Sequence, residues 1–147
     1  MIRPSTRARY AVRAMIELAI HEGSGPLQLR EVAQAQRISV KYLEQLTIPL
    51  RRAGLVQAER GPQGGYELAK PAYDITAREI VEAVEGSLGV LECVRNSDFC
   101  ERTSACAARS LWARVSDAIT SVLSDTTLAD LREQQLAAQT GVPAYQI

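Results

Sequence analysis

Apolar residues recur every three or four positions along the first third of the chain, and this spacing predicts three helices. Ser5 or Thr6 is a suitable N-cap for the first helix, and Ser39 is a suitable N-cap for the third. The second and third helices are short and joined by a tight turn, which is typical of a helix-turn-helix. The predicted helices cover residues 6–22, 29–38 and 40–48.

Pro49 stands where the third helix would continue. Proline has no N–H to donate to the carbonyl four residues earlier, here that of Gln45, and its ring crowds the same carbonyl. The third helix is therefore predicted to kink or end near Ile48, before a further turn that carries Arg51 and Arg52.

Two stretches with strand character follow, at residues 55–60 and 66–70, on either side of the sequence GPQGG. Glycine adopts positive φ without strain, as the turn between two paired strands requires. A β-hairpin directly after a helix-turn-helix is the wing of a winged-helix domain. Residues 1–70 are therefore predicted to form a winged helix-turn-helix DNA-binding domain, in a protein of mainly α (α+β) class.

The second half of the chain has a helical pattern on both sides of one irregular segment, residues 93–106. Thr76 and Glu79 have the spacing of a capping box, which predicts a helix within the connecting segment 71–92. Residues 107–135 form a long helical pattern with a break at the sequence SDTT. Residues 136–147 show no strong period and are expected to be a loose tail.

The predicted long C-terminal helix has a broad apolar face, and such a face needs a partner surface. A second copy of the chain is the economical partner, which predicts a homodimer, while packing against the chain's own winged domain is the alternative. The side chains predicted to form the dimer interface are Leu111, Trp112, Val115, Ile119 and Val122.

The formal net charge of zero conceals an asymmetry between the two halves. Residues 1–70 carry eleven Lys or Arg against six Asp or Glu, and residues 71–147 carry six against eleven. A basic half can face an anionic partner such as double-stranded DNA. The sequence holds no apolar run long enough to span a membrane and no secretory signal, so a cytoplasmic protein is expected.

Outward-facing side chains of the third helix and the wing are the candidate DNA contacts. Glutamine can pair with adenine, glutamate can accept from the cytosine amino group, and lysine or serine can reach base edges or phosphates. An arginine at the mouth of the wing can enter a narrow minor groove. The predicted DNA-binding residues are Ser39, Lys41, Tyr42, Glu44, Gln45, Arg60, Gln63 and Gly64, with Arg7, Arg9, Arg51 and Arg52 as electrostatic contacts.

All three cysteines of the chain, Cys93, Cys100 and Cys106, lie in the irregular segment 93–106. Thiolate sulfur is the usual ligand of iron–sulfur clusters and other soft metal sites. The spacing, with six and then five intervening residues, differs from the Cys-x2-Cys of zinc ribbons. Three reduced thiols without a ligand, or a zinc site completed by His21, are the alternatives.

Several blocks of the chain, from about residue 3 to about 132, resemble the winged-helix regulators that include IscR, NsrR, RirA and CymR. The resemblance implies a homodimeric transcription factor, usually a repressor, that binds a roughly palindromic operator. It also implies an iron–sulfur cluster held by the three cysteines, as in many members, although CymR-like members lack one. The blocks are most similar to IscR-type members, which favours 2Fe–2S over 4Fe–4S. They read TRARYAVRAMIELA, SVKYLEQLTIPLRRAGLV, RGPQGGYELAK, ITAREIVEAVEG and CAARSLWARVSDAITSVLSDTTLADL.

The sequence departs from that family pattern at the fourth cluster ligand. IscR-like members have a histidine three residues after the last cysteine, where this chain has Arg109, which cannot coordinate a metal while charged. NsrR-like members use a carboxylate from the partner's first helix, where residues 7–9 offer none. The first gap between cysteines is also one residue longer than in IscR and NsrR. The candidates left open are Asp98, Glu101, His21, another residue of the partner protomer, and an exogenous small molecule.

These observations favour a DNA-binding regulator whose operator affinity follows the state of an iron–sulfur cluster that senses iron, redox state or nitric oxide. The alternative is a winged-helix interaction module, or a cluster-free regulator, whose cysteines act as a thiol redox switch. An enzyme is not expected. The chain offers one histidine, no nucleophile paired with a base, and no phosphate-cradling loop.

Overall fold

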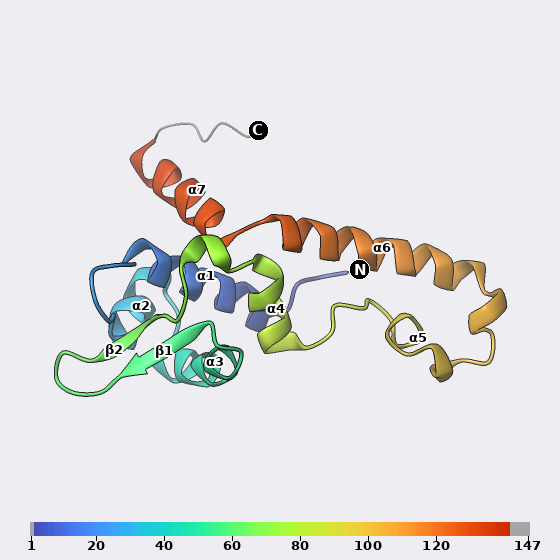
Figure 1. The fold of residues 1–147 in the computed structure, drawn as a ribbon, viewed down its shortest axis with the longest axis horizontal. Helices are drawn as coiled ribbons and strands as arrows, with labels where there is room; N and C mark the ends of the chain where they lie inside the picture. Colours follow the sequence, from blue (N-terminus) through green and yellow to red (C-terminus); the bar gives the residue numbers. More distant parts are fainter. Residues whose placement is uncertain (1, 142–147) are drawn as a thin grey trace.

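The computed structural model describes residues 2–141, which form a winged-helix head and a long helical arm (Figure 1). The helices and strands of the head are α1 (Thr6–Ile20), α2 (Leu29–Gln36), α3 (Val40–Arg52), β1 (Val56–Glu59), β2 (Gly65–Leu68), the 3-10 turn η1 (Ala72–Asp74) and α4 (Ala77–Glu85). The arm contains α5 (Glu92–Arg95), the 3-10 turns η2 (Ser97–Phe99) and η3 (Thr103–Ala105), and α6 (Ala107–Asp125). The last helix, α7 (Leu128–Thr140), returns to the head.

The core of the head lies where α1, α2 and α3 meet. Met15, Leu43, Leu46 and Leu50 are at most 2% exposed there. Burying each such side chain contributes about 1.5–3 kcal/mol. The apolar periodicity of the first 48 residues therefore predicted most buried positions of these helices, whereas Val40, expected on the inner face of the third helix, is 40% exposed.

The helix starts also agree with the sequence. The Ser5 hydroxyl accepts a hydrogen bond from the Ala8 N–H at 2.9 Å, and the Ser39 hydroxyl accepts one from the Tyr42 N–H at 3.1 Å. The turn between α2 and α3 places Arg37 in the left-handed region, with φ of 53°. Few residues other than glycine adopt this conformation, and composition gave no signal for it.

The prediction that the third helix ends near Ile48 is wrong, because α3 continues through Pro49 to Arg52, and a kink there stays a prediction. The Ala53 N–H donates to the Pro49 carbonyl at 3.0 Å, so the helical hydrogen-bond ladder resumes after the proline. The buried side chain of Leu50 anchors the last turn of α3 in the core. This packing offsets the one hydrogen bond that proline removes.

The predicted strands 55–60 and 66–70 are present as the shorter pair β1 and β2, which are antiparallel with Val56 opposite Leu68. Leu27, in the segment before α2, pairs with Tyr66 of β2 through an isolated antiparallel β-bridge. The Leu27 N–H donates to the Tyr66 carbonyl at 2.9 Å, and the Tyr66 N–H donates to the Leu27 carbonyl at 2.8 Å. A Cβ on Gly65 would lie 2.5 Å from the Leu27 oxygen, so this close approach requires glycine.

Residues 107–135 belong to two helices, α6 and α7, and do not form the single dimerisation helix expected there. The break is at Thr126 and Thr127, within the sequence SDTT. The expected loose tail also differs, because α7 continues to Thr140, while residues 142–147 lie outside the described residues.

A short β-bridge fastens this break to the start of α4. The Ala77 N–H donates to the Thr126 carbonyl at 2.8 Å, and the Leu128 N–H donates to the Ile75 carbonyl at 2.7 Å. Ile75 and Leu128 are completely buried beside these bonds. We call these six residues, 75–77 and 126–128, the Thr76–Thr127 bridge.

Both threonines of the bridge cap the helix that follows them. Thr76 forms the predicted capping box with Glu79, and Thr127 forms a second one with Asp130. Burial alone would raise the pKa of Glu79, but hydrogen bonds from Lys70 and Thr76 outweigh it and lower that pKa. The bridge is therefore held by main-chain bonds, buried apolar side chains and two helix caps.

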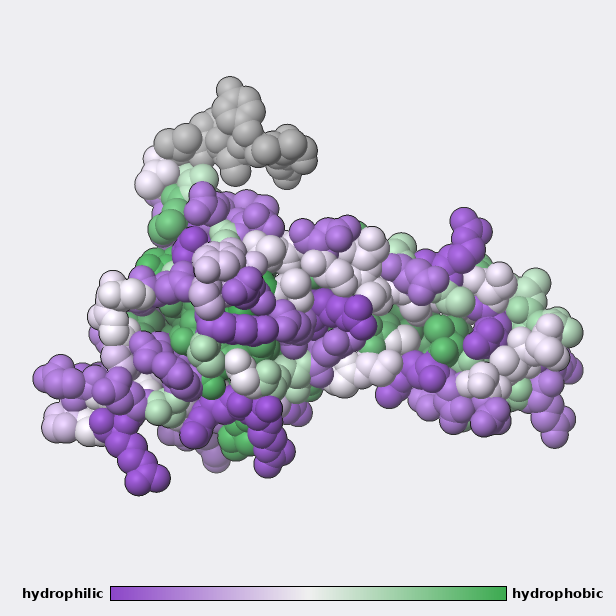
Figure 2. Space-filling model, viewed as in Figure 1, coloured by the Kyte–Doolittle hydropathy of each residue, from purple (hydrophilic) through white to green (hydrophobic). Residues whose placement is uncertain are grey.

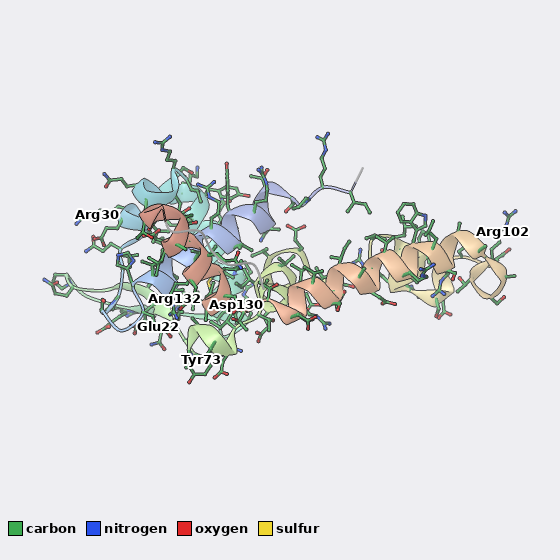
Figure 3. The ribbon with its side chains drawn as sticks, turned by 90° about the horizontal axis from the view of Figure 1, so that it is seen from above. Glu22, Arg30, Tyr73, Arg102, Asp130 and Arg132 are labelled. Atoms are coloured by element: carbon green, nitrogen blue, oxygen red, sulfur yellow. The ribbon has the colours of Figure 1, made fainter. Side chains whose placement is uncertain are left out.

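The returning helix α7 packs on the head through an ion pair. Arg132 Nη1 lies 2.7 Å from Glu22 Oε2, and the other oxygen of Glu22 accepts the Ala72 N–H at 3.0 Å. Figure 3 shows Glu22 and Arg132 close together beside the head. Packing on the chain's own winged domain is thus the role of α7, whereas α6 extends away from the head.

Shortening Leu128 to alanine should lower the free energy of unfolding by about 2–5 kcal/mol, because the side chain is completely buried behind the bridge. Leu136→Ala is the matched control in the same helix, where the side chain is 40% exposed and the expected loss is about 1 kcal/mol or less. Urea unfolding followed by circular dichroism measures both. Equal losses in the two variants would contradict the role given to the bridge.

Candidate DNA interface and cysteine loop

The exposed face of α3 carries the polar side chains expected to read DNA. Lys41, Glu44 and Gln45 are exposed, and within the described part of the chain none of them forms a side-chain hydrogen bond or ion pair. Ile48 lies farther along the helix and is 51% exposed. The major groove of DNA is wide enough for one α-helix. With α3 in that groove, these side chains can reach the base edges.

The structure uses Ser39 and Tyr42 to hold α3 in place. The Ser39 hydroxyl is engaged as the N-cap of the helix. The Tyr42 ring is half-buried and packs edge-on against Tyr10 of α1, with ring centroids 5.6 Å apart and an angle of 89° between the planes. Arg9 and Arg13 flank the same Tyr10 ring at 5.8 and 5.5 Å. Direct contact of Ser39 and Tyr42 with DNA stays a prediction.

The wing presents its charged and polar tip to solvent, as Figure 2 shows by the hydrophilic residues around the hairpin. Arg60 and Gln63 are exposed. Gly64 is buried, and its N–H donates to the Gly61 carbonyl at 3.0 Å within the turn. The Gly64 amide is therefore occupied in this conformation, and a side chain there would collide with the Glu59 carbonyl.

A basic groove lies between the end of α3 and β1. Arg51 and Arg52 belong to the last turn of α3, where a positive charge also interacts favourably with the helix dipole. Both are exposed, as is Arg7 at the start of α1. Arg13 is instead engaged with Gln36, whose side-chain oxygen accepts from its Nε at 3.1 Å. The groove is lined by Ile48, Arg51, Arg52, Val56, Gln57 and Ala58.

The cysteine loop, residues 93–106, consists of short turns at the far end of the arm (Figure 1). Cys93 belongs to α5, Cys100 follows η2, and Cys106 caps α6. None of the three forms a disulfide; Cys100 is exposed and the other two are half-buried. Thr103 closes the middle of the loop, its hydroxyl donating to the carbonyls of Cys100 and Ser97 at 2.6 and 2.8 Å.

The described residues do not form a ready-made metal site, since no group of three or more His, Cys, Asp or Glu side chains is gathered among them. Asp98 and Glu101 are exposed in the same loop. His21 lies in the head beside Glu17, whose carboxylate is 3.6 Å from its Nδ1. The zinc alternative that uses His21 from the same chain therefore lacks the geometry it needs.

Arg109 occupies the base of the cysteine loop. Its backbone N–H donates to the Cys106 sulfur at 3.4 Å, and its Nε donates to the Cys93 carbonyl at 2.8 Å. The side chain is half-buried. Sequence comparison identified this position only as a missing ligand, and the spacing of the residues gave no sign of these contacts.

The apolar stripe of α6 is largely uncovered within one chain. Leu111 and Val122 are 52% and 66% exposed. Trp112, Val115 and Ile119 are half-buried. Ser116, whose hydroxyl accepts from the Val90 N–H at 3.1 Å, is the one residue of α6 that is buried. An apolar groove between α1, α4 and α6 continues the stripe onto the head, lined by Pro4, Ala8, Arg9, Val12, Arg13, Val81 and Leu123.

Among the described residues, none of the helices has both the length and the apolar character required to cross a bilayer.

Comparisons with known proteins agree with this architecture. The family model of Rrf2, described as an iron-dependent transcriptional regulator, matches residues 4–134. The HTH-type transcriptional regulator IscR of Photorhabdus laumondii is 40% identical over 134 residues, which are 91% of this chain and 81% of that protein.

Two solved structures are similar over nearly the whole chain. IscR of T. potens superposes with a TM-score of 0.78 at 39% identity, covering 94% of this chain and 91% of that one. CymR, named the global cysteine regulator of B. subtilis, superposes with a TM-score of 0.77 at 43% identity, covering 90% and 98%. The predicted winged helix-turn-helix fold and the resemblance to this group of regulators are confirmed.

Proposed function

This chain belongs to the Rrf2 family of transcriptional regulators, and we propose that it is a homodimeric repressor whose affinity for operator DNA follows the state of its cysteine loop. Its relatives are named as transcriptional regulators, and the chain is likewise a regulator and not an enzyme. The observation that carries the proposal is the order of three parts along the length of the molecule. A DNA-reading head lies at one end, the cysteine loop at the other, and an uncovered apolar stripe between them.

The donor set of the loop fits an iron–sulfur cluster in its chemistry. Cys93, Cys100 and Cys106 supply three thiols without a disulfide, and thiolate is the usual protein ligand of such clusters. The family description as iron-dependent supports this assignment. We assign the three cysteines as ligands of a 2Fe–2S cluster, with the fourth ligand open. When bound, the cluster supplies a centre that responds to iron supply, redox state or nitric oxide.

The cysteine loop acts on DNA binding through α6. No residue of α5, η2 or η3 is buried, so binding by the cysteines would add to the order that the loop's own hydrogen bonds supply. A change in loop order shifts the N-terminal end of α6, while the Thr76–Thr127 bridge fixes the other end to the head. Helix α3 is the recognition helix, the one that enters the major groove. In a dimer this shift changes the spacing of the two α3 helices, which must match half-sites about 34 Å apart.

A second candidate function is a cluster-free regulator whose cysteines form a thiol redox switch. The observation that favours it is the arrangement of the loop, where the three sulfurs are not gathered and Cys100 is exposed to oxidants. The similarity to CymR, which is named as a cysteine regulator, supports the same alternative.

The DNA interface is tested on duplexes selected by the wild-type protein from a random pool. Gln45→Ala should weaken binding to the selected sequence by about 1–3 kcal/mol, because it removes a base contact. Arg60→Ala should weaken binding and also reduce the slope of the logarithm of the binding constant against the logarithm of salt concentration by about one. Fluorescence anisotropy at several salt concentrations measures both effects.

Arg114→Ala is the charge-matched control, since Arg114 is exposed on α6 at a distance from the recognition helix. Binding by Gln45→Ala and Arg60→Ala that equals binding by this control would argue for a protein-interaction module.

The dimer interface is tested with Val122→Glu, which places a charge on the most exposed apolar side chain of α6. This variant should sediment as a monomer, because a buried unpaired carboxylate costs several kcal/mol. Leu136→Glu, on an exposed apolar position of α7, should remain a dimer. A dimeric Val122→Glu protein would place the interface elsewhere.

The cluster is tested by anaerobic purification and reconstitution, followed by visible absorption, iron and sulfide analysis. Wild-type protein should hold iron and sulfide in equal amounts, and Cys100→Ser should lose most of both. Ser104→Ala, in the same loop, should retain them. A colourless, iron-free wild-type protein would eliminate the cluster, and a dependence of DNA affinity on thiol oxidation would then support the redox switch.

A further inference from the structure

Arg109 connects the first and the last cysteine of the loop. It is the third residue of α6, and its backbone N–H donates to the Cys106 sulfur at 3.4 Å. Its side chain reaches back to the other end of the loop, where Nε donates to the Cys93 carbonyl at 2.8 Å. One residue therefore closes a segment whose ends are thirteen positions apart in the sequence.

The other hydrogen bonds that the structure describes within this segment are local and join residues at most six positions apart. Its short helices bury no side chain. Segments with so few buried contacts open readily. The side-chain hydrogen bond of Arg109 consequently carries much of the order that holds the Cys93 backbone beside the first turn of α6, next to Cys106.

The chemistry of arginine suits a role beside a thiolate site. A guanidinium stays charged at all ordinary pH values and has no lone pair to offer a metal, but it has five N–H donors. Within the described part of the chain, the two terminal nitrogens of Arg109 have no hydrogen-bond partner. They remain able to donate to cysteine sulfur or to an anionic ligand, and charge-assisted hydrogen bonds of this kind are stronger than neutral ones.

We propose that Arg109 is a positioning residue of the cysteine site, which fastens Cys93 to Cys106 and donates to the anionic groups gathered there without ligating a metal. The part that concerns a metal rests on the proposed function. The part that concerns the thiols does not, because it describes the loop before anything is bound.

The thiol part is tested on the metal-free full-length protein by oxidation with diamide, which accepts the two electrons and two protons released when two thiols form a disulfide. Peptide mass mapping then measures how the disulfides are distributed among the three possible pairs. In wild-type protein Cys93–Cys106 should dominate. In Arg109→Ala its yield relative to the other pairs should fall roughly fivefold, the factor that corresponds to one ordinary hydrogen bond.

Arg102→Ala is the matched control. It removes the same charge from the same loop, and Arg102 projects from the tip of the arm in Figure 3, without a side-chain partner among the described residues. This variant should keep the wild-type distribution of disulfides. Arg109→Lys keeps the charge but not the planar fork, so it should behave like Arg109→Ala if the hydrogen bonds matter more than the charge.

The metal part is measured as iron bound per chain after anaerobic reconstitution and as the rate of iron loss to a chelator. Iron should leave Arg109→Ala several times faster than wild type or Arg102→Ala, with all three proteins equally folded by circular dichroism. If Arg109→Ala does not fold, Arg109→Gln takes its place.

Unchanged disulfide yields together with unchanged iron loss in the Arg109 variants would overturn the proposal. Wild-type protein that binds no iron would refute the cluster and leave the disulfide comparison to decide the role of Arg109.

Discussion

The Thr76–Thr127 bridge is the constraint on which the rest of this architecture depends. Two main-chain hydrogen bonds join residues that are 49 and 53 positions apart, and they lie where the arm meets the head. Each such bond contributes only about 0.5–1.5 kcal/mol net, and burial of Leu128 adds about 1.5–3 kcal/mol. Both threonines also cap helices, so rotation of α6 against the head would disturb two helix starts together.

Because of this constraint, the arm is attached to the head at one end and extends away from it at the other (Figure 1). Helix α6 has nineteen residues and, at the usual rise, is about 28 Å long. Its C-terminal end is fixed by the bridge, and α7 strengthens that attachment through the Arg132–Glu22 ion pair. Its N-terminal end carries Cys106 and Arg109 and adjoins the cysteine loop, in which no residue is buried. The bridge residues Ile75 and Leu128 belong to the same buried cluster as Met15 and Leu43, so the C-terminal end of α6 is anchored in the core of the head.

Local signals explain why so much of the fold was predictable from the sequence. Apolar spacing located α1–α4, the serines and Thr76 marked helix starts, and GPQGG marked the wing turn. Each of these depends on residues at most a few positions apart. Pro49 misled the prediction because the cost of a proline is local, whereas the burial of Leu50 that offsets it depends on α1 and α2. The pairing of Thr76 with Thr127 could not be read from either segment alone.

The candidate site was predictable in part for the same reason. Cysteine and arginine identities indicated which chemistry to expect, but the contacts of Arg109 depend on how a poorly buried loop folds back on α6. Tyr42 illustrates the opposite case. Its place on the recognition helix suggested a base contact, and the structure directs its ring against Tyr10 in the head.

The most direct test of the account is the distance between the two recognition helices of a dimer, measured with and without iron. Spin labels attached at Glu44 through a non-cysteine chemistry would report this distance by double electron–electron resonance. A dimer whose DNA affinity follows the cysteine loop should give two different distance distributions, with the tighter DNA-binding form nearer to one helical turn of DNA, about 34 Å. Identical distributions in the two forms, with different DNA affinities, would contradict it.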